Sequence, residues 1–313
     1  MACTVAMAQD FCDAIGQTIQ EAKTLVSQGN TSRALNMLKR AQNIPELKEC
    51  PNYSRLADEI RRIEAQQSSS SSGTTGTTFS NQNINITANG ITFTMVAVQG
   101  GTFTMGATSE QGSDAGSSEK PAHRVTLSNY YIGQTEVTQA LWQAVMGSNP
   151  SKWKGSNLPV EQVSWNDCQQ FITKLNQLTG RKFRLPTEAE WEYASRGGNK
   201  SRGYKYAGSN DIGSVAWYSD NSGKKTHPVG QKQANELGIY DMSGNVLEWC
   251  QDWYDKEYYS KSPSNNPCNN ISGSDRVIRG GSWYLVAWSC RVAYRHCGAP
   301  DGSDFSLGLR LAL

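Results

Sequence analysis

The chain has 313 residues, which is enough for one domain of about 200–250 residues and a smaller one. Its 30 basic and 28 acidic residues leave a net charge of +2, so the composition gives no reason to expect a nucleic-acid or anionic-membrane partner. No segment approaches the ~18–20 apolar residues of a membrane span. The first residues also lack the charged and apolar regions of a secretory signal. The compartment stays open, because Cys3 is also compatible with the lipid-bearing cysteine of an exported protein.

Eight cysteines are scattered along the chain without a C-x-x-C pair. A zinc site normally needs two closely spaced pairs of ligands, so this pattern argues against zinc. Disulfides stay open, and the simplest expectation is that most of these cysteines are free thiols.

Residues 1–66 are predicted to form a helical module. Apolar residues recur at three- and four-residue spacing over 14–26 and 34–41, and a third candidate helix covers 53–65. The pattern resembles a single tetratricopeptide-like repeat, which is too short to stack alone. Two interpretations remain, namely a spacer that self-associates and a groove that binds a partner.

Residues 67–81 are predicted to be a flexible linker, because serine, threonine and glycine dominate them. Residues 82–313 contain short alternating segments, frequent glycine and all nine tryptophans. Strands are predicted over 91–96 and 125–127, and helices follow capping residues within 135–142 and 164–171. The pattern indicates an α+β domain with much irregular chain between 197 and 241.

The end of the chain combines a frame with unrelated residues between its parts. The frame consists of Arg279-Gly280-Gly281-Ser282-Trp283, Cys290-Arg291, Arg295, Pro300-Asp301 and 307–311. No helix or strand period continues through it, and loops on a rigid scaffold are typical of recognition sites. We expect Trp283, Arg291 and Arg310 to be buried. We expect the following residues to be largely exposed on one face: Tyr284, Leu285, Val286, Ser289, His296, Gly298, Asp304 and Phe305. The interspersed positions between the frame elements, at about 284–306, are Tyr284, Leu285, Val286, Ser289, Tyr294, His296, Cys297, Gly298, Ala299, Gly302, Asp304, Phe305 and Ser306.

Segments in a fixed order over residues 90–313 resemble the formylglycine-generating-enzyme (sulfatase-modifying factor) domain. This resemblance implies an irregular C-type-lectin-like α+β fold. The segments that carry it are Val98-x-Gly100-Gly101-x-Phe103-x-Met105-Gly106, Glu119-Lys120-Pro121-x-His123, Thr135-Glu136-Val137-Thr138, Leu158-Pro159-Val160-x-x-Val163-Ser164-Trp165, Arg184-Leu185-Pro186-Thr187-Glu188, Gly238-x-Tyr240-Asp241-Met242-x-Gly244-Asn245-Val246-x-Glu248-Trp249 and Arg279-Gly280-Gly281-Ser282-Trp283.

Two metal expectations follow from this resemblance. The family's oxidase binds copper through two cysteines five residues apart, and these positions hold Leu285 and Cys290 here. Leucine offers no metal-binding atom, so we expect no copper and no oxidase activity. The resemblance also implies a structural Ca²⁺ bound by oxygen atoms at Asp241, Gly244, Val246 and Glu248. The alternative is a plain turn before a tryptophan-bearing strand.

The frame itself resembles that of the variable proteins of diversity-generating retroelements, which have the same fold. Their genes are rewritten at template adenines, mostly in asparagine codons, and the resulting codons cannot specify Met, Trp, Lys, Gln or Glu. None of these five residue types occurs at the interspersed positions, whereas Trp288 falls where a fixed residue is expected. The resemblance implies a non-catalytic protein that binds an unknown protein or cell-surface ligand. The alternatives are a surface loop without function, a structural component of a bacterial surface assembly, and a residual oxidase.

Overall fold

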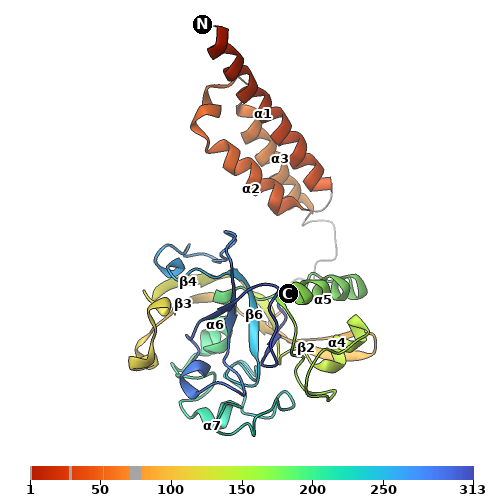
Figure 1. Cartoon of the computed structure of the whole chain (residues 1–313), viewed down its shortest axis with the longest axis vertical. Helices are drawn as coiled ribbons and strands as arrows, with labels where there is room; N and C mark the ends of the chain where they lie inside the picture. The colour runs from red at the N-terminus through yellow and green to blue at the C-terminus, as the bar shows by residue number, and fades with distance from the viewer. Residues whose placement is uncertain (1, 28–29, 52, 71–78) are drawn as a thin grey trace. The chain divides into compact units, whose positions relative to one another are not determined.

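The computed structural model describes residues 2–27, 30–51, 53–70 and 79–313 (Figure 1). The chain divides into two compact units, residues 1–78 and 79–313. Of the predicted linker, residues 71–78 lie outside the described part. Residues 67–70 continue helix α3 and correct the predicted start of the linker. Once a helix is nucleated, each added residue gains a hydrogen bond, so propagation into serines costs little.

The first unit contains three helices and one 3-10 turn. Their apolar faces meet in a core that includes Ile15, Leu38, Leu56 and Ile63. Cys50 is disulfide-bonded, whereas Cys168, Cys250, Cys268, Cys290 and Cys297 are free thiols. No helix in the described residues is long and apolar enough to cross a membrane. The elements are α1 (Ala2–Ser27), α2 (Thr31–Gln42), η1 (Pro45–Glu49) and α3 (Ser54–Ser70).

The second unit contains three small sheets, with strand orders β1-β2-β5, β3-β4 and β8-β7-β6-β9. In the last sheet β6 pairs with β7 in antiparallel and with β9 in parallel orientation, and β8 lies at one edge. The strands are β1 (Ile84–Ala88), β2 (Ile91–Val98), β3 (Gly101–Met105), β4 (His123–Leu127), β5 (Tyr130–Gly133), β6 (Leu247–Trp253), β7 (Arg276–Arg279), β8 (His296–Gly298) and β9 (Leu307–Leu309).

Local capping signals begin the helices of this unit. The Thr138 hydroxyl accepts a hydrogen bond from the Leu141 amide, so the helix predicted within 135–142 begins only at Gln139. Ser164 and Asp167 form a capping box at the start of the next helix. The helices are α4 (Gln139–Met146), α5 (Trp165–Thr179), α6 (Glu188–Ser195) and α7 (Ile212–Val215), with 3-10 turns η2 (Ser109–Asp114), η3 (Ser117–Glu119), η4 (Gly198–Lys200), η5 (Tyr258–Ser260) and η6 (Ala287–Cys290).

Two apolar clusters stabilise the second unit. One is built around Trp142, Phe171 and Trp249, and the other around Trp191 and Val277. Strand β6, near the middle of this unit in Figure 1, supplies residues to both clusters. The C-terminal tail therefore lies over a sheet whose position is set by packing on both of its sides.

Candidate ligand-binding face

Buried arginines fix the backbone of the tail. Arg291 binds both carboxylate oxygens of Glu119, with a shortest distance of 2.7 Å from its Nη2 to Oε1. Arg295 binds Glu188 in the same two-pronged way, with Nε 2.6 Å from Oε1. These contacts attach the tail to η3 and α6, and charged two-pronged pairs are both strong and geometrically specific. The frame arginines are at most 4% exposed: Arg279, Arg291, Arg295 and Arg310.

Arg310 holds the last strand against the centre of the unit. Its Nη2 lies 2.6 Å from Oε1 of Glu248, and it also donates hydrogen bonds to the carbonyls of Gly133 and Tyr240. The Trp191 indole donates a further hydrogen bond to Glu248. Both carboxylate oxygens of Glu248 are therefore bound by protein groups.

Two more carboxyl groups lie close to this pair. The side chain of Asp241 accepts a hydrogen bond from the Gly230 amide, and that of Glu136 accepts one from the Val246 amide. Burial, followed by the nearby charges of Asp241 and Glu248, raises the pKa of Glu136 well above its usual value. Burial also raises the pKa of Asp241 to about 6. Burial therefore disfavours the charged form of both carboxyl groups, Glu136 and Asp241.

Both acidic residues of the expected calcium site are already bound by protein groups. Glu248 binds Arg310 and Trp191, and Asp241 accepts a hydrogen bond from the Gly230 amide. Gly244 has a positive φ, and a Cβ there would lie 2.4 Å from the Trp217 carbonyl, so packing explains this glycine. No group of three or more His, Cys, Asp or Glu in the described residues is arranged to hold a metal. Calcium binding at this site stays a prediction.

Aromatic side chains from the interspersed positions form two groups. In the first, Tyr284 and Phe305 contact the frame residue Trp283, with ring centroids 5.4 and 5.5 Å away, and Trp153 packs edge-on against Trp283. The ammonium group of Lys152 lies 5.0 Å from the Phe305 ring centroid. Edge-to-face packing of this kind favours fixed ring orientations. The first group is therefore a rigid aromatic surface with a cation at its border.

The second group lies around η6 and β8. Trp288 packs edge-on against Tyr294 at 5.1 Å, and Tyr294 contacts His296 at 6.4 Å. Trp288 is 47% exposed although it belongs to the predicted fixed residues. It therefore contributes to the surface itself as well as to the scaffold.

Residues of the tail and of the four-stranded sheet line a hollow of about 310 Å³. Its apolar wall comes from the four-stranded sheet and includes Leu247, Trp249 and Ile278. His296 lines the hollow and also contacts Tyr294 of the second aromatic group. Leu285 and Asp304 line the hollow too, and they are adjacent in sequence to Tyr284 and Phe305 of the first group. The interspersed positions that line the hollow are Leu285, His296, Cys297, Gly298, Ala299, Gly302, Asp304 and Ser306. We call these positions, together with the two aromatic groups, the display face.

Most of the interspersed positions are at least partly accessible. Tyr284 is 61% and Val286 45% exposed, and His296, Ala299, Gly302 and Asp304 are exposed as well. Half-buried are Leu285, Tyr294, Cys297, Gly298 and Phe305. Leu285 packs against the main apolar core, so its exposure is smaller than predicted.

Ser289 and Ser306 are buried, which corrects the predicted exposure of Ser289. Ser289 lies in η6, and its carbonyl oxygen is 2.9 Å from the place where a Cβ of Gly281 would stand. The Ser306 amide and hydroxyl both donate to Asp304, and its carbonyl accepts from the Leu247 amide. Backbone packing of the frame turns both serines inward.

Sequence reasoning missed the residues that support the display face from below. Lys152 and Trp153 come from a loop that is far from the tail in the sequence. Their backbone amides both donate hydrogen bonds to the Glu161 carboxylate. Leu247 and Trp249 line the hollow as alternate residues of β6. A period-two pattern could have indicated the strand, but nothing local indicated that the tail would cover it.

Cys290 and Leu285 occupy the positions of the family's copper-binding cysteines. Cys290 is fully buried beside Tyr206 and Val215, and burial raises the pKa of its thiol to about 12. A thiol in an apolar surrounding stays protonated and is a poor metal ligand. Neither position therefore offers a thiolate.

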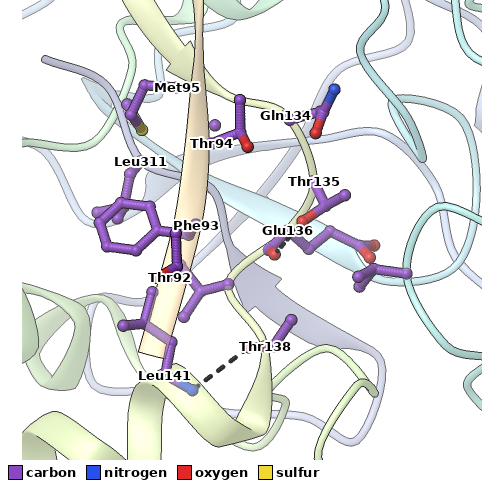
Figure 2. A pocket seen from close by; sticks show the side chains of 13 residues that line it. Thr92, Phe93, Thr94, Met95, Gln134, Thr135, Glu136, Thr138, Leu141 and Leu311 are labelled. Atoms are coloured by element: carbon purple, nitrogen blue, oxygen red, sulfur yellow. Dashed lines mark hydrogen bonds between the residues drawn. The ribbon is translucent and has the colours of Figure 1, made fainter. Parts of the chain in front are cut away.

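A second cavity of about 220 Å³ lies between β2, the 133–138 loop and α4 (Figure 2). Phe93, Leu141 and several threonines line it, and the carboxylate of Glu136 points away from the two apolar side chains. This carboxylate is bound by Asn245 and Val246, so the cavity contains no free charged group. It offers no evident catalytic chemistry.

The fold and the buried arginine network define a formylglycine-generating-enzyme-like, C-type-lectin-like domain. The chain belongs to the sulfatase-modifying factor enzyme 1-like domain family, which matches residues 83–313. It is 35% identical over 267 residues to "Chaperone protein LppX" of Paenibacillus barcinonensis, covering 69% of this chain and 88% of that protein. It is 31% identical over 283 residues to the formylglycine-generating enzyme of Streptomyces coelicolor, with the same coverage.

Solved structures give the same family. Treponema denticola variable protein 1 superimposes with a TM-score of 0.68 at 34% identity, covering 74% of this chain and 99% of that one. PvdO from Pseudomonas aeruginosa gives a TM-score of 0.64 at 26% identity, covering 74% of this chain and 97% of that one. The proteins similar to this chain thus include one named as an enzyme and one named as a variable protein.

Proposed function

We propose that this protein is a non-catalytic binding protein whose display face carries diversified side chains. The observation that carries the proposal is the difference in burial between the frame residues and the interspersed residues of the tail. The frame arginines are buried in ion pairs, whereas most interspersed positions are half-buried or exposed. A preorganised backbone lowers the ordering cost of binding, and aromatic residues dominate the strongest contacts of protein interfaces.

The likeness to Treponema denticola variable protein 1 supports the same assignment. The occupant of the face is an unknown protein or cell-surface ligand, and diversification by a retroelement accounts for the unrelated residues. An exported location fits this role. The disulfide at Cys50 supports export, because stable disulfides are typical of oxidising compartments.

Sequencing the DNA beside the gene tests the proposal directly. We expect a reverse-transcriptase gene and a near-copy of the 3′ end that differs at adenines within the codons of the interspersed positions. If neither is present in the complete genome, retroelement diversification is wrong. A structural component of a surface assembly would then account better for the same fold.

We expect the display face to tolerate substitution. Replacing Tyr284, Val286 and His296 together by alanine should lower the free energy of unfolding by about 1.5 kcal/mol or less, at ~0.5 kcal/mol for each exposed position. Urea unfolding followed by tryptophan fluorescence measures this change. A loss of several kcal/mol would show that these side chains serve the core and would contradict a display role.

We expect no copper-dependent oxidation of cysteine-containing sulfatase peptides. Leu285 cannot bind copper, and the Cys290 thiol is buried and protonated. Incubation with copper and peptide, followed by mass spectrometry, measures formylglycine directly. The Streptomyces coelicolor relative serves as the positive control, and product above the no-protein background would restore the oxidase alternative.

A further inference from the structure

The first aromatic group of the display face includes two residues of a loop that is bound to one glutamate. The backbone amides of Lys152 and Trp153 donate to Oε1 of Glu161 at 2.6 and 3.2 Å. The Ser151 hydroxyl donates to the Glu161 carbonyl and accepts a hydrogen bond from the Glu161 amide. Three consecutive residues, 151–153, are therefore bound to Glu161, and we call them the supporting loop.

The supporting loop contacts both a frame aromatic residue and an interspersed one. Trp153 packs edge-on against Trp283 and Phe305, with ring centroids 4.9 and 6.2 Å away. The ammonium group of Lys152 lies 4.8 Å from the Trp153 ring centroid and 5.0 Å from that of Phe305. Edge-on contacts of this kind fix ring orientations, and they are lost if the loop moves away. The order of this part of the display face therefore depends on the contacts of Glu161.

The carboxyl group of Glu161 is buried, and only one of its two oxygen atoms is bound. The residue is 0% exposed. Its Oε2 is buried without a hydrogen-bond partner in the described part of the chain. An unpaired hydroxyl at this oxygen costs some energy, but an uncompensated buried charge costs much more. The contacts of Glu161 therefore suit the protonated form of the carboxyl group, with the proton on Oε2.

The charged side chains around Glu161 act in opposite directions. Lys154 lowers the pKa of Glu161, whereas Asp304 of the tail raises it, and burial has a larger effect than either. The Lys154 ammonium group is exposed and donates to the Asn149 carbonyl. That of Lys152 lies over aromatic rings instead. The nearby cations therefore do not offset the burial of the carboxyl group.

Burial raises the pKa of Glu161 to about 7, although its two amide hydrogen bonds act against this change. If the supporting loop opens, water reaches the carboxyl group and its pKa returns toward the ordinary value of 4.5. The closed loop then binds a proton more tightly than the open loop does. By linkage, closure is most favourable below about pH 4.5 and loses this advantage as the pH rises through about 7. The two pKa values limit the whole change in the closure equilibrium to roughly 300-fold.

We propose that Glu161 is a positioning residue of the display face, and that a proton on its carboxyl group holds the supporting loop closed against the first aromatic group. This inference rests on the proposed function and adds a regulation of the same site. A ligand that needs this aromatic group then binds more strongly in mildly acidic than in alkaline solution. The reason is that Trp153 and Lys152 keep their places beside Trp283 and Phe305.

Hydrogen exchange of the full chain, followed by NMR, tests the proposal without a ligand. The reporters are the Lys152 and Trp153 amides, and their protection is measured relative to the intrinsic exchange rate at each pH. The control variant is Glu161→Gln, whose side chain keeps an acceptor oxygen and has no charge at any pH. We expect the ratio of wild-type to variant protection to fall between about pH 4.5 and 7, by up to roughly 300-fold, and to stay level above. This ratio removes the effects of Asp241 and Asp252, because both titrate in the two proteins alike.

Two further variants test the same point if Glu161→Gln does not fold. Asp304→Asn removes the negative charge that faces Glu161, so the midpoint of the pH dependence should move to lower pH. Lys154→Gln removes the positive charge, so the midpoint should move to higher pH. Asp167→Asn is the matched control, because Asp167 is a half-buried carboxylate that accepts a backbone amide elsewhere, at the start of α5. It should leave the reporters unchanged.

A ratio that stays constant across this pH range would overturn the proposal. Midpoint shifts of the same sign for Asp304→Asn and Lys154→Gln, or no shift for either, would overturn it as well. Failure of the proposed function looks different, because the retroelement would then be missing while the Lys152 and Trp153 amides still lose protection as the pH rises.

Discussion

Replacing Arg310 by alanine should lower the free energy of unfolding by about 3–5 kcal/mol, because it leaves Glu248 buried without its partner. The carbonyls of Gly133 and Tyr240 would lose a donor at the same time. Repulsion adds to the effect, since Asp241 lies close to Glu248 and its raised pKa of about 6 already reflects the burial of charge there. Urea unfolding at neutral pH measures the change.

Arg184→Ala is the matched control. Arg184 also forms a two-pronged pair, with Glu190, but its side chain is 40% exposed. Pairs accessible to water contribute about 1 kcal/mol or less, so the two substitutions should differ several-fold. Replacing Arg310 and Glu248 together by Met and Leu should cost less than Arg310→Ala alone, because neither charge is then left unpaired. Equal losses for Arg310→Ala and Arg184→Ala would contradict the central role of the pair.

The second large effect is expected for Trp283→Ala, at about 3–5 kcal/mol of unfolding free energy. Trp283 is 5% exposed and packs between Trp153, Tyr284 and Phe305, and its indole donates to the Phe305 carbonyl. Its removal opens a cavity beneath the first aromatic group. Both interspersed aromatics would then lose the surface that orients them, so stability and ligand binding should fall together.

Trp288→Ala is a control in the same tail and for the same residue type. Trp288 is 47% exposed, and its loss should change the unfolding free energy by about 0.5 kcal/mol. Thermal melting of the two variants gives the comparison. A Trp288 variant as unstable as the Trp283 variant would place Trp288 in the scaffold and reduce the extent of the display face.

Much of the candidate site could be predicted because its signals are local in sequence. The Gly-Gly-Ser-Trp turn, the spacing of the frame arginines and the loop-forming residues between them indicated a fixed backbone with exchangeable side chains. The structure confirms the burial of Trp283, Arg291 and Arg310. Capping residues such as Ser164 similarly marked helix starts, because a cap depends on groups only a few residues apart.

What the sequence could not provide depends on contacts between distant segments. Glu248 is a predicted calcium ligand from its own motif, and its carboxylate also binds Trp191 and Arg310, which lie 57 and 62 positions away in the sequence. Ser289 looked exchangeable, but close packing of η6 against the backbone at Gly281 buries it.

The sequence by itself determined the family, the helical module before the α+β domain and the division of the tail into frame and interspersed positions, since each depends on short-range patterns. Only the tertiary structure decided that the tail covers the four-stranded sheet and leaves a hollow above Trp249 and Ile278. It also decided that Lys152 and Trp153 join the first aromatic group. The physical reason is that a pocket is made by the packing of several chain segments, and no single segment contains its shape.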